Sequence, residues 1–313
     1  MKWLVFITLL ACAVVAAPLP AQPRGAPFTV QETGEGFDQL ADAVAAIGGG
    51  RGTISIAPGT YRQCAVQNEG EIAYVAAVPG QAVFDGVACE GKAALVLGGR
   101  AARVEGIVFQ NIRVPDMNGA GIRLEAGELT VRNSLFRDGE NGILAASDSN
   151  GAIRIEQSTF SRLGACPEDQ GCSHSIYNSG SGTLTVTRSR FERGTGGHYL
   201  KSRSPLIEVT DSSFDDSAGT ATNYMIDLSD GATGTIARNT FVQGANKENY
   251  SAFIMVAPEA REHSSAGLTI TDNEAGLVPG LTRRTAFVAD GSGEAITIAN
   301  NRLDAQIARL ERR

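Results

Sequence analysis

The sequence predicts an all-β fold in which the chain winds into a stack of coils, a β-solenoid. The main observation is a repeat: an alternating apolar strand is followed by a polar residue, then Ser or Thr, then Phe. It recurs as LTVRNSLF, IRIEQSTF, LTVTRSRF, IEVTDSSF and TIARNTF. A second short strand precedes each copy, as in GIRLEAG, GILAAS, SIYNSG, HYLKSRS and YMIDLSD. Apolar residues alternate with a spacing of two, which excludes helical repeats. Such short coils can bury their inward side chains only against neighbouring coils.

The recurring phenylalanines predict one column of rings inside the solenoid. They are Phe109, Phe136, Phe160, Phe191, Phe214 and Phe241. The polar residue just before each ring is expected at a turn, where side chains stacked as a ladder can bond the turn backbone. LTITDNEA and ITIANNRL continue the pattern without the aromatic residue.

Both ends of the stack carry candidate caps, which solenoids need to cover their open ends. Before GGGRGTISIAPGTY, helical spacing relates Phe37, Leu40, Val44 and Ile47, which predicts a short amphipathic capping helix. At the other end, residues 304–313 are expected to be a tail or a short helix, with Leu303, Ile307 and Leu310 as its apolar positions. Residues 27–303, which include the N-terminal cap, are predicted to form one elongated parallel β-helix domain without a linker.

Residues 1–21, MKWLVFITLLACAVVAAPLPA, read as a secretory signal peptide, because one Lys is followed by an apolar run and small residues. Cleavage is expected before Gln22. A cut after Ala17 is the alternative, and Leu9-Leu10-Ala11-Cys12 also resembles a lipoprotein box. No later apolar run is long enough to cross a bilayer. We therefore expect an exported protein, periplasmic or extracellular, and a monomer.

The chain is acidic, with 27 Lys and Arg residues against 34 Asp and Glu residues. This balance argues against nucleic acid and anionic membrane surfaces as partners. Without Cys12 of the leader, four cysteines remain, and an even number in an exported chain predicts disulfides. Three pairings are possible. We favour Cys166–Cys172, which closes a short loop, and Cys64–Cys89, which would join adjacent coils.

The opening F-x-x-L-x-x-A-V-x-x-I with TISIAPGTY, together with the coils, resembles single-stranded right-handed parallel β-helix proteins of the pectate-lyase-like superfamily. The resemblance covers nearly all of the mature chain. HSIY (174–177), GHYLKSR (197–203), YMIDLSDG (224–231) and the ARNTFVQG coil are similar to an exported bacterial subgroup of unsettled activity. This chain departs from that subgroup at Ser204, Ser229 and Asp230, none of which looks chemically decisive. The resemblance implies carbohydrate chemistry, most often on acidic polysaccharides, by lyases, hydrolases or epimerases.

The stretch GGHYLKSRS (196–204) concentrates cations in this acidic chain and predicts a site. Each short second strand can be aligned with the others by the repeat strand that follows it. In this alignment one column of residues points inward: Ile122, Ile143, Ile176, Leu200 and Ile226. Their outward neighbours are Arg123, Leu144, Tyr177, Lys201 and Asp227, and two residues further lie Glu125, Ala146, Ser179, Arg203 and Ser229. Parallel strands lie about 4.8 Å apart, so Lys201 should lie between Tyr177 and Asp227. Strand alternation would also place Tyr199 on the side of Lys201 and Arg203.

These residue types suit β-elimination of a uronate polymer. Arg203 would neutralise the carboxylate through its planar fork. Lys201 would act as the base if its pKa falls, and Tyr177, Tyr199 or His198 would protonate the departing oxygen. Alternatively, His198 is the base and Lys201 its charge partner. Asp227 completes the catalytic set, and the expected substrate-binding residues are Arg123, Tyr199, His174 and Glu125.

Other interpretations of the same residues stay open. Lys201 and Asp227 could be an ordinary cross-strand ion pair, worth about 0.2–1 kcal/mol. His174 and His198 could be stacked turn residues bonded to backbone, and His263 is expected to be solvated. The site could also hold an acidic glycan without chemistry, or the rod could be a structural spacer.

A hydrolase would need a second carboxylate beside Asp227, and Glu125, Asp215 and Asp216 are the candidates. A calcium-dependent lyase would need a cluster of acidic ligands, for which Asp227 and Glu125 alone are too few, so no metal is assigned.

Overall fold

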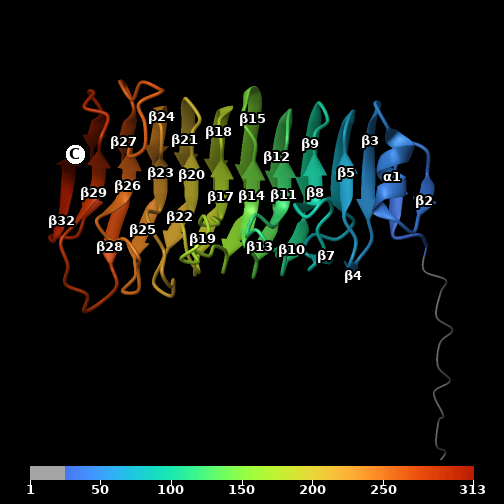
Figure 1. The fold of residues 1–313 in the computed structure, drawn as a ribbon, viewed down its shortest axis with the longest axis horizontal. Helices are drawn as coiled ribbons and strands as arrows, with labels where there is room; N and C mark the ends of the chain where they lie inside the picture. The colour runs from blue at the N-terminus through green and yellow to red at the C-terminus, as the bar shows by residue number, and fades with distance from the viewer. Residues whose placement is uncertain (1–24) are drawn as a thin grey trace, which may run out of the picture.

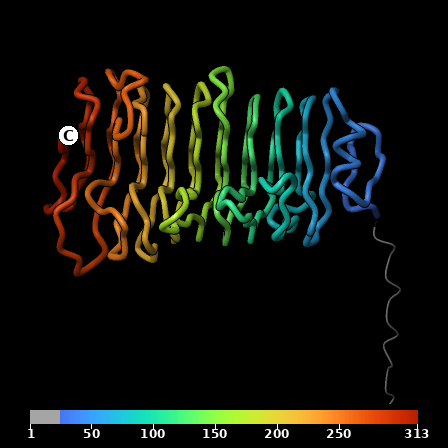
Figure 2. Tube along the Cα trace, viewed as in Figure 1, coloured from blue at the N-terminus to red at the C-terminus, as the bar shows by residue number. Residues whose placement is uncertain are grey.

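The computed structural model describes residues 25–313 and has the predicted fold, a right-handed parallel β-helix drawn out as a rod of stacked coils (Figures 1 and 2). Each coil contributes a strand to each of three sheets that run along the rod. The leader predicted at residues 1–21 lies outside the described residues. No helix in the described part of the chain is long and apolar enough to span a bilayer.

The first sheet contains, in spatial order, β2 (Glu35–Phe37), β1 (Phe28–Val30), β3 (Arg51–Ile56), β6 (Glu71–Ala76), β9 (Ala101–Glu105), β12 (Glu128–Arg132), β15 (Asp148–Glu156), β18 (Ser181–Thr187), β21 (Leu206–Thr210), β24 (Thr233–Ala237), β27 (Thr269–Thr271) and β30 (Thr297–Ala299). The second contains β4 (Gly59–Tyr61), β7 (Ala82–Asp85), β10 (Ile107–Gln110), β13 (Leu135–Arg137), β16 (Thr159–Ser161), β19 (Arg190–Glu192), β22 (Ser213–Asp215), β25 (Thr240–Gln243), β28 (Glu274–Leu277) and β31 (Arg302–Leu303).

The third sheet contains β5 (Ala65–Gln67), β8 (Ala93–Leu97), β11 (Ala120–Leu124), β14 (Asn141–Ala145), β17 (Ile176–Asn178), β20 (Leu200–Ser202), β23 (Ile226–Leu228), β26 (Ala252–Val256), β29 (Thr285–Asp290) and β32 (Ile307–Arg312). Neighbouring strands pair in parallel except in the N-terminal cap, where β1 runs antiparallel to β2 and β3.

The predicted column of phenylalanines is confirmed. In the second sheet Phe109 pairs with Phe136, and the register continues coil by coil to Phe241. Successive ring centroids from Phe109 to Phe241 lie 4.6 to 5.0 Å apart and the rings are nearly parallel. The column begins one coil earlier than predicted, at Phe84. These stacked rings, all buried, form the core of the rod.

The predicted polar ladder also forms, at the turn between the first and second sheets. Its members are Ser134, Ser158, Ser189, Ser212, Asn239, Asn273 and Asn301, and each backbone N–H from Ser134 to Asn273 donates to the side-chain oxygen of the next member. The residue before each member has a left-handed φ between 46° and 58°. The ladder thus satisfies backbone donors that the turn removes from the strands.

Removing one member of the ladder should destabilise the rod. We expect Ser189→Ala to lower the free energy of unfolding by about 1–3 kcal/mol, because the buried N–H of Ser158 loses its acceptor. Ser189→Asn is the matched control, since asparagine fills the same position in later coils and supplies an oxygen. Denaturant unfolding measures both. Equal stability of Ser189→Ala and the wild type would contradict the assigned role.

The N-terminal cap is as predicted, and the C-terminal cap is not. Helix α1 (Leu40–Ile47) buries Leu40 and Val44 against the first coil, although Phe37 belongs to β2 and not to the helix. The predicted C-terminal helix is wrong, because Ile307 and Leu310 lie in strand β32, which pairs with β29. The open edge of β29 offers a full row of backbone partners, whereas an isolated helix this short is unstable in water.

Both predicted disulfides are present. Cys64–Cys89 joins the turns before β5 and β8 and therefore ties adjacent coils together. Cys166–Cys172 closes the loop that precedes β17.

Candidate functional site

The candidate site lies on the outer face of the third sheet, where β17, β20 and β23 run side by side. The register pairs Tyr177 with Lys201 and Lys201 with Asp227, as the spacing predicted. The neighbouring positions, Leu200 among them, point inward and are fully buried. Alternation along three short strands therefore brings a phenol, an ammonium and a carboxylate to one face.

Arg203 follows β20 directly and joins this group. Its Nε donates to the Tyr177 hydroxyl oxygen at 3.2 Å, and its Nη1 forms an ion pair with Asp230. Burial opposes the positive charge, but the hydrogen bonds to the phenol and to carboxylates outweigh it and raise the pKa of Arg203. The Lys201 ammonium lies 5.6 Å from the centroid of the Tyr177 ring. The two cations are thus held in place by aromatic and acidic partners.

Glu259 completes the cluster, and the sequence analysis missed it. It follows β26 in a loop, and its carboxylate bridges the cations: one oxygen accepts from Lys201 and the other from Arg203. Partial burial raises its pKa, but these two hydrogen bonds outweigh burial and lower it. Glu259 is 58 residues from Lys201 in sequence, and no repeat relates the two, so spacing could not have found it.

Asp227 lies beneath Lys201, with 3.9 Å between the ammonium and the carboxylate. Its side chain is 3% exposed, and burial raises its pKa to about 6, although the charge of Lys201 acts in the opposite direction. Oδ2 of Asp227 lies 3.2 Å from Nε2 of His198, and Oδ1 accepts from the Ser229 hydroxyl. Asp227 can therefore exchange a proton near neutral pH.

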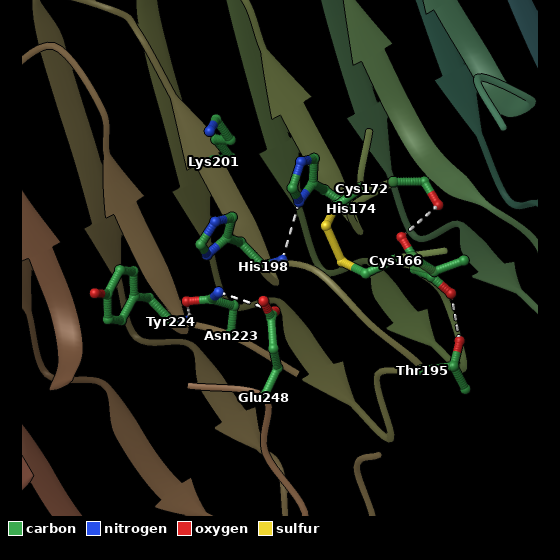
Figure 3. The surroundings of a disulfide bond; sticks show 12 residues. Cys166, Cys172, His174, Thr195, His198, Lys201, Asn223, Tyr224 and Glu248 are labelled. Carbon is green, nitrogen blue, oxygen red and sulfur yellow. Dashed lines mark hydrogen bonds between the residues drawn. A yellow bond between two sulfur atoms is a disulfide. The ribbon is translucent and has the colours of Figure 1, made fainter. Parts of the chain in front are cut away.

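The two histidines that precede β17 and β20 stack on each other, as one of the two sequence interpretations held (Figure 3). Their ring centroids lie 5.1 Å apart, and Nδ1 of His174 accepts the backbone N–H of His198 at 2.9 Å. Tyr224 stacks on the other side of His198. Gly197, with φ +61°, allows this close approach, because a Cβ there would lie 2.7 Å from Nδ1 of His174.

Burial keeps both rings neutral. It lowers the pKa of His174 to about 3, and it lowers that of His198 well below its usual value. The His198 ring contacts Asp227 but is itself mostly buried, so it lies next to the site on the side away from solvent. His263 is not simply solvated as expected, since its Nε2 lies 3.0 Å from the Arg203 carbonyl oxygen.

Tyr199 is not on the face with Lys201 and Arg203, and that prediction is wrong. The backbone turns at the start of β20, so the ring points inward and is 1% exposed. Its hydroxyl donates to Asp216, which also pairs with Lys247 inside the rod. Tyr199 and Asp216 therefore cannot touch a ligand in this conformation.

Arg123 and Glu125 lie on the predicted face but outside the cluster. They are on or beside β11, three strands from β20, which corresponds to roughly 14 Å. There Glu125 pairs with Arg123 and with Lys92. Glu125 is four strands from Asp227, too far for the paired carboxylates of a hydrolase. Asp215 belongs to β22 of the second sheet and pairs with Arg190.

Two of the departures from the resembled subgroup prove to contact the cluster. Ser229 donates to Asp227, and Asp230 pairs with Arg203. Ser204 instead accepts a hydrogen bond from the buried Asn178 amide beneath the strands. Ser229 and Asp230 therefore touch the cluster, whereas Ser204 does not.

The carboxylates of the cluster are not grouped as metal ligands in the part of the chain that the structure describes. Among residues 25–313, no three His, Cys, Asp or Glu side chains lie close enough together to hold one ion. The carboxylates of the cluster instead bind cationic side chains.

Fold and site together define a β-helix protein with a charged cluster on the outer face of one sheet. The family model described as a right-handed β-helix region matches residues 94–303, and the chain belongs to that family. Among solved structures, a pectin methylesterase mutant in complex with a hexasaccharide is similar over 90% of this chain and 78% of that chain, with 10% identity and a TM-score of 0.38. No curated protein sequence matches the chain.

Proposed function

We propose that the outer face of the third sheet binds an acidic polysaccharide, with one carboxylate of the polymer between Lys201 and Arg203. The observation that carries this proposal is the bridging of both cations by one carboxylate, that of Glu259. An ammonium and a planar guanidinium directed at one point suit a carboxylate better than a neutral sugar hydroxyl.

The position of the cluster supports a polymeric ligand. The face is the side of a long rod (Figure 1). Arg123 on β11 and Lys92 directly before β8 lie further along the same sheet. A chain of uronate residues can reach from the Lys201 cluster to this second group of cations. A small acid can occupy only one of these two groups of cations.

Cleavage by β-elimination is the second candidate, and Tyr177 favours it. Its oxygen accepts from Arg203, so its own hydrogen stays available for a departing glycosidic oxygen. In this reaction Arg203 neutralises the carboxylate of the uronate. Lys201, when unprotonated, takes the proton from the carbon that carries this carboxylate. A carbon–carbon double bond forms as the carbon–oxygen bond to the next sugar breaks.

Binding can be measured by calorimetry with polygalacturonate and alginate, and with neutral dextran for comparison. We expect Lys201→Met to raise the Kd for the bound uronate polymer about ten- to hundredfold, because a charge-assisted hydrogen bond contributes about 1.5–3 kcal/mol. Arg154→Ala is the matched control, since Arg154 is an exposed cation of the first sheet, paired with Glu128. Added salt should weaken binding.

The same incubations distinguish the candidate functions. An ultraviolet-absorbing unsaturated product that Lys201→Met abolishes supports elimination, and binding without it supports a non-catalytic glycan-binding protein. If no uronate polymer binds at low salt, the proposed function is wrong and a structural role remains.

A further inference from the structure

Glu259 lies at the solvent side of the cluster. Its side chain is 42% exposed, whereas those of Lys201 and Arg203 are 12% and 24% exposed. Each of its two oxygens accepts from a different cation. A ligand approaching the cations from solvent therefore meets this carboxylate first.

The backbone of the Glu259 loop is held without help from the Glu259 side chain. The N–H groups of Glu259 and Ala260 both donate to the Ser229 carbonyl oxygen, and the N–H of His263 donates to that of Asp230. The His263 ring adds a contact to the Arg203 carbonyl oxygen. The side chain can thus rotate away while the loop stays in place.

Both cations have partners other than Glu259 that would hold them in place when the Glu259 side chain leaves. Arg203 retains Tyr177 and Asp230, and Lys201 retains Asp227 below it and the Tyr177 ring beside it. Departure of Glu259 removes one negative charge and frees one donor group on each cation. What remains is a preformed space for one carboxylate.

We propose that Lys201 and Arg203 form a subsite for a single ligand carboxylate, which Glu259 occupies in the free protein, so that an acidic ligand binds by displacing the Glu259 side chain. The inference rests on the proposed function for the nature of the natural ligand. Glu259 then sets specificity, because a neutral sugar cannot replace the two ion pairs that it would break. A ligand carboxylate exchanges one pair of charge-assisted bonds for another.

The subsite can be tested without any polysaccharide. In Glu259→Ala the truncated side chain leaves the space open, and sodium acetate is the probe. We expect acetate, compared with sodium chloride at equal ionic strength, to raise the Tm of Glu259→Ala by about 2–4 °C and that of the wild type by less than 1 °C. Adding Arg203→Lys to Glu259→Ala should abolish the shift. Equal responses of wild type and Glu259→Ala would overturn the inference.

A second measurement links the subsite to the polymer. We expect Glu259→Gln, which keeps the shape and removes the charge, to lower the Kd for oligogalacturonate about tenfold. If the wild type binds oligogalacturonate and Glu259→Gln binds it with the same Kd, the inference is wrong while the proposed function stands. An acetate shift in Glu259→Ala without binding of any uronate polymer by any variant supports the subsite and overturns the proposed function.

Discussion

Asp216→Asn is expected to lower the free energy of unfolding by about 3–5 kcal/mol, because it leaves the Lys247 ammonium buried without its counter-charge. Both side chains are fully buried, and their charged atoms lie 3.1 Å apart. Asp216 also accepts from the Tyr199 and Thr222 hydroxyls, and Lys247 donates to Thr222 and to the Asn223 carbonyl oxygen. Denaturant unfolding with linear extrapolation measures the loss.

The exposed pair Arg238–Asp211 is the matched control. Its side chains are 57% and 44% exposed, so Asp211→Asn should change stability by less than about 1 kcal/mol. The double variant Asp216→Asn with Lys247→Met should recover much of the loss, because it removes both charges. Similar losses in Asp216→Asn and Asp211→Asn would refute the role of the buried pair. The pair joins successive coils, and Asp216 accepts from Tyr199, the residue next to His198, so we expect its loss to weaken the site as well.

Lowering the pH from 6 to 4 is expected to destabilise the protein through the stacked histidines. Their folded pKa values lie far below the unfolded value of 6.5, so below pH 6.5 the unfolded state binds more protons. His174, whose folded pKa is about 3, then lowers the free energy of unfolding by about 1.4 kcal/mol per pH unit, and His198 acts in the same direction. Asp227 acts in the opposite direction: its pKa is raised to about 6 from 3.8, so its contribution to stability grows as the pH falls through this window. Asp227 thus offsets part of the loss that the two histidines cause, and the net effect of lowering the pH is a loss of stability.

Comparison with His174→Asn isolates one histidine from the other titrating groups. Asparagine can still accept the His198 N–H, which His174 accepts at 2.9 Å. The plot of unfolding free energy against pH should be less steep for this variant by about 1.4 kcal/mol per pH unit between pH 4 and 6. Parallel curves for the two proteins would show that His174 is not held neutral by burial.

The repeat was sufficient to predict the fold and part of the site. Alternation with a period of two assigns each strand residue to a face, and parallel stacking repeats that assignment in every coil. For this reason the phenylalanine column, the polar ladder and the order Tyr177, Lys201, Asp227 could all be predicted from spacing. The same periodic constraint placed Cys64 and Cys89 one coil apart.

Features outside the period depended on the tertiary structure. Tyr199 immediately precedes its strand, where the backbone turns and alternation no longer applies, so its ring enters the core. Glu259 belongs to a loop whose length differs from those of the other coils, and only folding brings its carboxylate to Lys201 and Arg203. The C-terminal residues became a strand because an unpaired sheet edge was available to them. Local periodicity thus determines which way a strand residue points, whereas the partners of a loop residue are decided by chain segments far away in sequence.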